Sequence, residues 1–264
     1  MQKEQAGKIS SAPLRVAMVG YLNTVPLVYG LQHGQGQYDL DLLIPAECYT
    51  AFDTGRVDVA LVPVGVLPLL QQGADIVTDY CIGCTAAVRT VCLLTNVPIH
   101  DVKKIHLDTH SRTSVLLTRV LMAHHWCQDV SYESSNVTTI AASDLGDGEA
   151  VLMIGDKVFD VEGQYRYSYD LGEQWYEMTG LPFAFAVWVA KPDVSQATID
   201  QLSADLAHGV MNIPASLAEH KEEDLAFDLD EYFREHIDYH FNDGKKEAVH
   251  IFLQMIGGLP NPSF

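Results

Sequence analysis

The beginning of the chain alternates short apolar runs with helix-like segments, and this alternation constrains the fold most. The strand candidates are Arg15–Gly20, Leu40–Ile44 and Val57–Val62, and the helix candidates between them are Val25–Leu31 and Ala46–Thr54. Pro26 is tolerated in the first turn of a helix, and Gly55 ends the second helix. This β-α-β-α-β order predicts a mainly parallel sheet with helices on both faces.

The remaining chain contains further strand candidates and then becomes helical. Strands are predicted at Thr85–Thr95, Lys104–Asp108, Ala150–Ile154 and Leu181–Ala190, and helices at Arg112–Trp126, Thr198–Met211, Leu229–Tyr239 and Lys245–Ile256. The helix at 112–126 is the clearest, because its apolar residues recur near helical spacing. No long Pro/Ser-rich linker is present, so two lobes would be joined by short segments that cross between them twice.

Composition limits the partners. The chain has 264 residues, of which 48% are hydrophobic, enough for one large domain or two modest lobes. Its net charge is −19, so we expect no nucleic-acid and no membrane partner. A dianionic substrate would need local help from Arg side chains or from helix N-termini.

The sequence shows no apolar run of signal-peptide length near its start and no stretch of about 18 apolar residues. We therefore expect a cytoplasmic protein. The oligomeric state stays open, and a homodimer is compatible with the sequence.

Cysteine and histidine spacing argues against a metal or disulfide framework. The five cysteines are an odd number in a long chain, and Cys81 and Cys84 form an isolated C-x-x-C pair. This pair is either a redox or metal pair or two small core residues, and the second interpretation is favoured. The histidines have no ligand spacing, so we predict no metal.

The segment Gly20–Thr24 follows the first strand, where open α/β sheets bind ligands. Asn23 carries both a donor and an acceptor and suits a hydroxyl or a carboxylate. Capping of the next helix is an equally good interpretation of Asn23.

The segment Asp108–Ser114 places hydroxyls, Arg112 and free backbone N–H groups at a predicted helix start. This pattern favours a carboxylate site over a helix that is merely well capped.

Arg89 and Thr90 fall inside an apolar predicted strand. Arg89 either faces solvent or reaches into a cleft, where a substrate carboxylate would be its partner. Asp156 follows the strand at 150–154, where a helix N-cap is the ordinary role.

Taken together, these segments resemble the chorismate dehydratase family of menaquinone biosynthesis. The ordered blocks that carry the resemblance are VGYLNTVPLVYGL, GRVDVALVPV, DYCIGCTAAVRTVCLL, HLDTHSRTSVLL, VLMIGDKVF and YDLGEQWYEMTGLPFAFAVWV. Each block alone is weak, but the ordered set is specific. It runs from about Arg15 to Ala190, and the helical tail is similar to the family only in character.

The resemblance implies an α/β fold of two lobes, like the type II periplasmic solute-binding proteins, with mixed, mostly parallel sheets. The first lobe would hold residues 1–95 and 182–264, and the second residues 96–181. The ligand would occupy the cleft between the lobes.

The resemblance also implies a reaction without a cofactor: loss of water from chorismate to give 3-[(1-carboxyvinyl)oxy]benzoate in the futalosine route. The matched motifs hold no obvious base, and one hypothesis is that the substrate's own enolpyruvyl carboxylate takes the proton. The family more often has Ser at the position of Thr90. The expected catalytic residues are Asn23 and Thr90, and the expected substrate-binding residues are Tyr21, Thr24, Arg89, Ser111, Thr113, Ser114 and Asp156.

Three other hypotheses stay open. The chain is a non-catalytic cytoplasmic protein of the same fold that binds a small carboxylate, a related lyase or other small-acid enzyme, or a redox protein that uses Cys81 and Cys84. Turnover of chorismate would distinguish an enzyme from the non-catalytic binding protein. A basic or nucleophilic His in a cleft would favour the second, and loss of function in Cys81→Ser the third.

Overall fold

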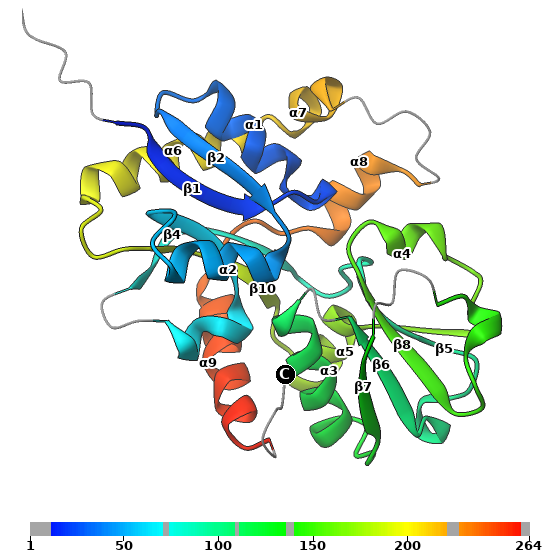
Figure 1. Cartoon of the computed structure of the whole chain (residues 1–264). Coiled ribbons are helices and arrows are strands. Elements are labelled where there is room, and N and C mark those ends of the chain that lie inside the picture. The colour runs from blue at the N-terminus through cyan, green and yellow to red at the C-terminus, as the bar shows by residue number, and fades with distance from the viewer. Residues whose placement is uncertain (1–11, 71–73, 109–110, 136–139, 221–226, 260–264) are drawn as a thin grey trace, which may run out of the picture.

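The computed structural model describes residues 12–70, 74–108, 111–135, 140–220 and 227–259. Within these residues the chain forms two lobes, each built around a five-stranded sheet with helices packed on it (Figure 1). The two-lobed α/β organisation expected from the sequence is therefore confirmed.

The first sheet has its most buried strands in the middle. Its order is β2 (Tyr38–Leu43), β1 (Leu14–Val19), β3 (Val59–Pro63), β10 (Phe183–Ala190) and β4 (Asp75–Cys84). β1 runs parallel to β2 and β3, whereas β10 is antiparallel to β3 and β4. All residues of β3 and β10 are buried, which explains why both read as continuous apolar runs.

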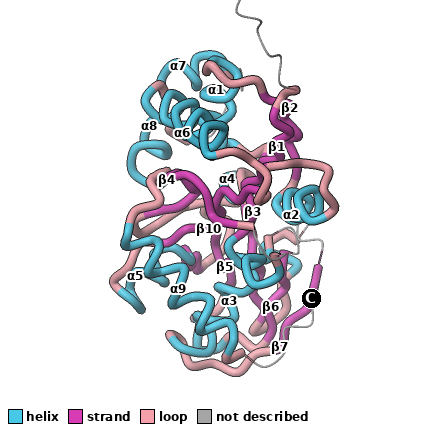
Figure 2. The backbone as a smooth tube through the Cα atoms, turned by 90° about the vertical axis from the view of Figure 1, so that its left-hand side faces the viewer, coloured by secondary structure: helices cyan, strands magenta, loops and turns pink. Residues whose placement is uncertain are grey.

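Helices cover both faces of this sheet, as Figure 2 shows. α2 (Pro45–Asp53) packs on β1 and β3, while α1 (Val25–His33) and α6 (Gln196–Met211) pack together on the other face. Two glycines permit the close contact of α1 with α6. A Cβ on Gly30 would lie 2.2 Å from the Asp205 carbonyl oxygen, and one on Gly209 would lie 1.9 Å from that of Pro26. Larger residues at either position would push the helices apart.

Asp205 of α6 ties this helix pair to the loop before β2. Its carboxylate accepts hydrogen bonds from Tyr38 Oη at 2.6 Å, Gln35 N at 3.0 Å and Gly36 N at 2.9 Å. Burial by itself raises the pKa of Asp205, but the hydrogen bonds from Tyr38 and the two amides outweigh it, and the net pKa lies below the ordinary 3.8.

The second sheet is also mixed. Its order is β7 (Ser131–Ser135), β6 (Lys104–Asp108), β8 (Glu149–Ile154), β5 (Val91–Thr95) and β9 (Tyr167–Asp170). β6, β7 and β8 are parallel, and β5 is antiparallel to β8 and β9. Leu93 and Leu152 join the main core, whereas Leu94 and Val151 join a second cluster, because successive side chains face opposite sides of a sheet.

Helices α3 (Arg112–His124) and α5 (Leu171–Thr179) pack against this sheet and against each other, and the short α4 (Lys157–Asp160) follows β8. The structure also has short 3-10 helices at Leu22–Thr24, Val64–Leu69, Ile99–Asp101 and Ala142–Asp144.

The first crossing between the lobes differs from the expected boundary. The strand predicted at 85–95 is wrong for residues 85–90, which connect β4 to β5 without regular structure. β5 already pairs within the second sheet, so the crossing lies before Val91 and not after residue 95. The chain returns after α5, whose C-cap residue, Gly180, has a φ of 73°, a left-handed conformation that favours glycine.

The tail after α6 adds α7 (Ile213–Glu219), α8 (Leu229–Glu231), a π-helical turn at Tyr232–His236 and α9 (Asp243–Gly257). The helix predicted at 229–239 is therefore wrong beyond His236. Instead, Tyr239 O accepts a hydrogen bond from Cys81 N of β4 at 2.8 Å. The fully buried Lys245 holds this extended segment through Asp238 O and His240 O.

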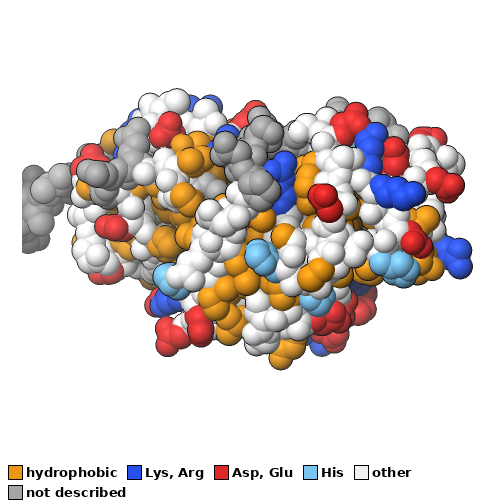
Figure 3. Space-filling view, turned by 90° about the horizontal axis from the view of Figure 1, so that it is seen from below, with side chains coloured by type: hydrophobic (Ala, Val, Ile, Leu, Met, Phe, Trp, Pro, Cys, Tyr) orange, Lys and Arg blue, Asp and Glu red, His pale blue; other side chains and the backbone are white. Residues whose placement is uncertain are grey.

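No helix in the described part of the chain has the length and apolarity needed to span a bilayer. On the face seen in Figure 3, Lys and Arg side chains (blue) lie in small separate groups among acidic and neutral ones. Among the residues drawn there, this face presents no continuous basic surface of the kind that binds a nucleic-acid backbone.

The lowered pKa of Asp205 makes a prediction about stability and pH. A carboxyl whose folded pKa is depressed stabilises the fold above its unfolded pKa, near 3.8, and loses this contribution as pH falls through its folded pKa. We expect Asp205→Asn to lower the free energy of unfolding by about 1–3 kcal/mol at pH 7. Urea denaturation from pH 7 to pH 3 should show the gap to wild type narrowing below about pH 4.

The exposed Asp200 on the same helix provides the matched control, since Asp200→Asn removes a carboxylate without disturbing the loop before β2. An unchanged gap between Asp205→Asn and wild type across this pH range would contradict the role assigned to the carboxylate.

Candidate functional site

A cavity of about 60 Å³ lies where the two lobes meet. Its walls are apolar, with Ile82 and Phe185 from the first lobe and Val91 and Ile154 from the second. The polar side chains of its lining are Tyr21, Asn23, Thr90, Ser111 and Ser114. A concave apolar site with few convergent polar groups is the ordinary form of a small-molecule site.

The structure brings together five of the nine residues that the sequence predicted, namely these polar lining residues. The other four lie outside the lining: Thr24, Arg89, Thr113 and Asp156. The roles proposed for all nine stay predictions, but the positions of these four change what their side chains can do.

Asn23 reaches the cavity from the 3-10 helix after β1. Two contacts shape this turn: Thr24 Oγ1 lies 2.7 Å from Val19 O and Tyr21 O, and Tyr239 Oη donates to Asn23 O at 2.7 Å. The Thr24 hydroxyl is thus occupied within the protein, contrary to its predicted contact with substrate.

The Asn23 side-chain oxygen is buried and has no hydrogen-bond partner among the residues that the structure describes. Capping of α1 does not explain it, since no side chain caps that helix. An unsatisfied buried acceptor costs about 1–3 kcal/mol, so a molecule that donated a hydrogen bond to this oxygen would remove that cost.

Tyr21 supplies a neutral phenol to the cavity. Burial, together with the nearby carboxylates of Asp108 and Asp156, raises the pKa of Tyr21 to about 12. Tyr21 therefore stays protonated at neutral pH and can donate a hydrogen bond, but it is a poor base.

The start of α3 supplies two hydroxyls. Ser111 is the N-cap, and its Oγ accepts from Ser114 N at 3.3 Å and lies 3.0 Å from Ser114 Oγ. Both side chains line the cavity, so the positive end of the helix dipole faces it, as the carboxylate-site interpretation requires. Thr109 and His110 lie outside the described residues.

Thr113, the second residue of α3, does not line the cavity. Its hydroxyl accepts from Gly65 N at 3.0 Å and donates to Phe185 O at 3.0 Å. It therefore fastens the second lobe to the first, and the prediction that it contacts substrate is not supported by its position.

Arg89 is also turned away from the cavity. Its φ is 64°, its guanidinium pairs with Glu162 at 3.0 Å, and it lies 5.4 Å from the centre of the Phe159 ring. The partner of Arg89 is thus a glutamate of the second lobe, which corrects the expectation of a substrate carboxylate.

Thr90, the next residue, is 2% exposed and does face the cavity. Its carbonyl accepts from Gly155 N at 2.8 Å, and its Oγ1 lies 3.3 Å from the Tyr232 hydroxyl and 3.5 Å from Val88 O. The left-handed turn at Arg89 sends these neighbouring side chains in different directions.

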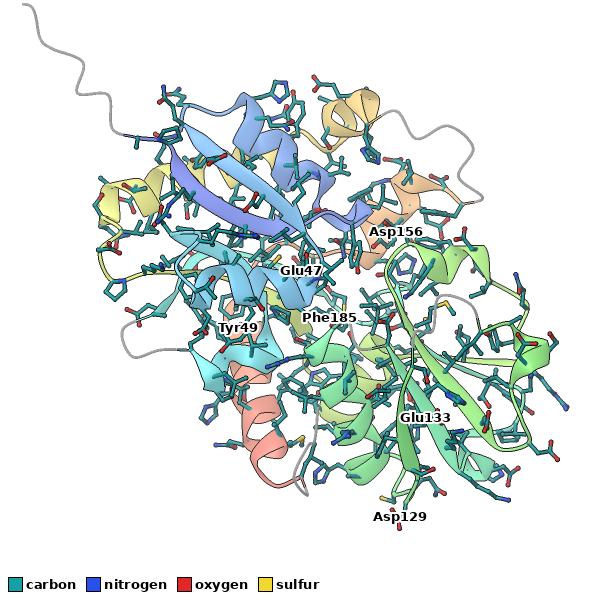
Figure 4. The ribbon with its side chains drawn as sticks, viewed as in Figure 1. Glu47, Tyr49, Asp129, Glu133, Asp156 and Phe185 are labelled. Atoms are coloured by element: carbon teal, nitrogen blue, oxygen red, sulfur yellow. The ribbon has the colours of Figure 1, made fainter. Side chains whose placement is uncertain are left out.

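Asp156 joins the lobes instead of lining the cavity. Its Oδ2 accepts from Leu22 N at 3.0 Å. Asp156 is the N-cap residue of α4, but its side chain does not cap that helix. Figure 4 labels Asp156 and Phe185, which lie along the boundary of the two lobes. The position supports a role in holding the lobes together next to Asn23.

Sequence reasoning missed two features near the cavity. Buried Asp108 at the end of β6 forms an ion pair with Lys157, the first residue of α4. Tyr232, from the C-terminal part of the chain, contacts Thr90. Neither partner has a local sequence signal, because the contacts span 49 and 142 positions.

The cysteines show no redox site. All five are free thiols, and burial raises the pKa of Cys81 to about 12 and that of Cys84 well above its ordinary value. Both thiols thus stay protonated and weakly nucleophilic, which favours the interpretation as core residues.

The chain matches one family model, described as menaquinone biosynthesis, over residues 14–257. Among solved structures it is similar to a protein of Archaeoglobus fulgidus, with a TM-score of 0.74 and 16% identity over 94% of this chain and 98% of that one.

Two further solved structures extend the likeness. An ABC transporter of Parabacteroides distasonis gives a TM-score of 0.64 at 18% identity, over 94% and 93% of the two chains. A Candida albicans protein described as having the generic periplasmic binding protein structural fold gives 0.58 at 11% identity, over 96% and 92%. The expected periplasmic-binding-protein-like fold is confirmed, and at these identities the likeness shows the fold alone.

The different surroundings of Thr113 and Ser114 make a prediction about stability. Thr113→Val keeps the shape but leaves Gly65 N–H and Phe185 C=O without their partner, so it should lower the free energy of unfolding by about 1–3 kcal/mol. Denaturant unfolding measures the loss.

Ser114→Ala is the matched control, because within the described part of the chain its hydroxyl bonds only to Ser111 Oγ beside the cavity. We expect a loss below about 1 kcal/mol. Equal losses in the two variants would show that the Thr113 hydroxyl does not fasten the lobes.

Proposed function

The chain belongs to the menaquinone biosynthesis family, and from this premise we propose that it is a chorismate dehydratase of the futalosine route. The product is 3-[(1-carboxyvinyl)oxy]benzoate, formed with loss of water. The observation that carries the proposal is the buried oxygen of Asn23, which has no partner among the described residues. It lies in an apolar cavity between the lobes that hydroxyls at the start of α3 also line.

The reaction suits a site of this kind. The ring of chorismate is a diene, and loss of the C3 proton and the C4 hydroxyl makes it aromatic. The protein therefore has to bind two carboxylates, orient the hydroxyl and bring a base to the C3 proton. The proposal assigns the protein no cofactor.

The polar lining residues divide these tasks. A substrate carboxylate binds at the start of α3, where Ser111 and Ser114 donate hydrogen bonds beside the positive end of the helix. Asn23 Oδ1 accepts the hydrogen of the C4 hydroxyl and fixes the direction of its C–O bond. Thr90 donates to the leaving oxygen.

The substrate supplies the base. Among the described residues, the polar lining of the cavity contains no carboxylate and no imidazole, and Tyr21 is protonated. In the proposed step the enolpyruvyl carboxylate takes the C3 proton, the C3–H electron pair forms the new double bond, and the C4–O bond breaks. The carboxylate then returns the proton to the departing hydroxide, which leaves as water.

The small volume implies that the lobes separate when substrate enters. About 60 Å³ holds a few water molecules, whereas drug-sized ligands occupy roughly 300–1,000 Å³. Opening would break the Asp156–Leu22 hydrogen bond, which spans the two lobes.

A second candidate is a non-catalytic protein that binds a small carboxylate in the same cavity. The lack of an acid or base among its described polar lining residues favours it, because binding needs only hydrogen bonds and helix N–H groups.

The test is to mix the purified chain with chorismate, without added cofactor or metal, and to follow the aromatic product by chromatography. We expect catalytic turnover in the wild type. Asn23→Ala should lower kcat by at least about 100-fold, because it removes the group that orients the hydroxyl.

Asn96→Ala is the control, since the Asn96 amide bonds to Ala142 O in the second lobe, away from the cavity. Tight binding of chorismate without product would favour the binding protein. If chorismate is neither bound nor converted, the dehydratase is refuted. Full turnover by Asn23→Ala would refute the role of Asn23.

A further inference from the structure

Tyr232 lies fully buried in the π-helical turn at 232–236, far along the chain from every polar lining residue. Aromatic rings surround it: Phe159 at 5.4 Å, Phe227 at 6.0 Å and Phe233 at 5.2 Å between centroids. Within the described residues, the hydroxyl of Tyr232 has one hydrogen-bond partner, Thr90 Oγ1 at 3.3 Å. The Tyr232 hydroxyl therefore lies within an apolar cluster and contacts one polar group there, the Thr90 hydroxyl.

The direction of this hydrogen bond follows from what each group needs. Burial raises the pKa of Tyr232, so the phenol keeps its hydrogen, and a buried hydrogen requires an acceptor. Thr90 Oγ1 is that acceptor. The hydrogen of Thr90 itself then needs another partner, and Val88 O is at the outer limit of 3.5 Å.

We propose that Tyr232 is a positioning residue for Thr90: by donating to Thr90 Oγ1, it aims the Thr90 hydroxyl hydrogen into the cavity, at the oxygen of the substrate. This inference rests on the proposed function and adds a residue to it. The chain of hydrogen bonds runs from Tyr232 through Thr90 to the departing hydroxyl.

In Thr90, the backbone is held by other contacts, and only the direction of the hydroxyl hydrogen still has to be set. Its backbone is already held, because its carbonyl accepts from Gly155 N at 2.8 Å. A threonine hydroxyl still rotates to suit its partners, and at 3.5 Å Val88 O is only a weak acceptor for its hydrogen. The bond from Tyr232 occupies one lone pair of Thr90 Oγ1 and so limits the directions that this hydrogen can take. Hydrogen bonds in a chain also polarise one another in a low-dielectric site, so the phenol makes Thr90 a stronger donor.

The experiment is a double-mutant cycle on the full-length chain with chorismate as substrate. Tyr232→Phe removes only the hydroxyl and should lower kcat by about 10-fold, with KM within about twofold of wild type. Thr90→Val should lower kcat at least as much. In the Thr90→Val background, Tyr232→Phe should have no further effect on kcat, because the partner of the phenol is gone.

Tyr165→Phe is the structural control. Its hydroxyl is also satisfied inside the protein, by Ile140 O at 2.8 Å in the second lobe, without contact to Thr90. It should leave kcat unchanged. If Tyr232→Phe lowers kcat by the same factor in both backgrounds, the phenol acts through the general structure, and the inference is overturned.

The failures of the two proposals are distinguishable. If the wild type is active and the effects of Tyr232→Phe and Thr90→Val on kcat are additive, only the role of Tyr232 is refuted. If the wild type binds chorismate without converting it, the dehydratase is refuted, and the same cycle is measured on Kd by calorimetry, where additivity again refutes Tyr232. A wild type that neither binds nor converts chorismate refutes both.

Discussion

The carboxylate of Asp170 holds the segment on which the rest of the site depends. It is half-buried and accepts backbone hydrogen bonds from Val88, Arg89, Gly172 and Glu173 at 2.6–3.1 Å. It thus binds the first crossing between the lobes to the start of α5. A non-glycine residue with a φ of 64° is strained and persists only when its surroundings over-determine it, and these bonds supply that constraint at Arg89. The turn sends the guanidinium into the second lobe and leaves the Thr90 hydroxyl at the cavity.

The cavity is a product of the boundary between lobes and belongs to neither lobe alone. Asn23 comes from the first lobe, Ser114 from the second, and Thr90 from the crossing. At the cavity the two lobes are joined by individual hydrogen bonds, from Leu22 N to Asp156 and through the Thr113 hydroxyl. Beside the cavity, α3 also packs on α9 and on the 3-10 helix at 64–69, so an apolar core continues from one lobe into the other. The hydrogen bonds at the cavity can be exchanged for water, whereas the apolar core cannot be opened without unfolding. A site that must admit a ligand and then enclose it benefits from this difference.

Local patterns in the sequence predicted the parts that local physics decides. β1, β3 and α3 follow from apolar runs and helical spacing, and the polar lining follows from motifs placed after strands and at a helix start. β4 was missed because its first six residues are partly exposed and do not form a continuous apolar run. The turn at Arg89 depends on Asp170, 81 positions away, and the contact of Thr90 depends on Tyr232, 142 positions away. A single sequence carries no signal of such partners, so Arg89 was assigned to the cleft and Tyr232 to no site.

The position of β10 in the first sheet also determines the order in which the two lobes can finish folding during synthesis. β3 ends at Pro63 and β4 begins at Asp75, yet β10, which starts at Phe183, lies between them in the sheet. All strands of the second lobe leave the ribosome before β10 does. The lobe whose strands are made first is therefore completed last, and until then β3 and β4 present open edges to the cell. The second lobe is continuous in sequence and can fold early. Its folding would keep β3 and β4 near each other until β10 is synthesised and pairs between them.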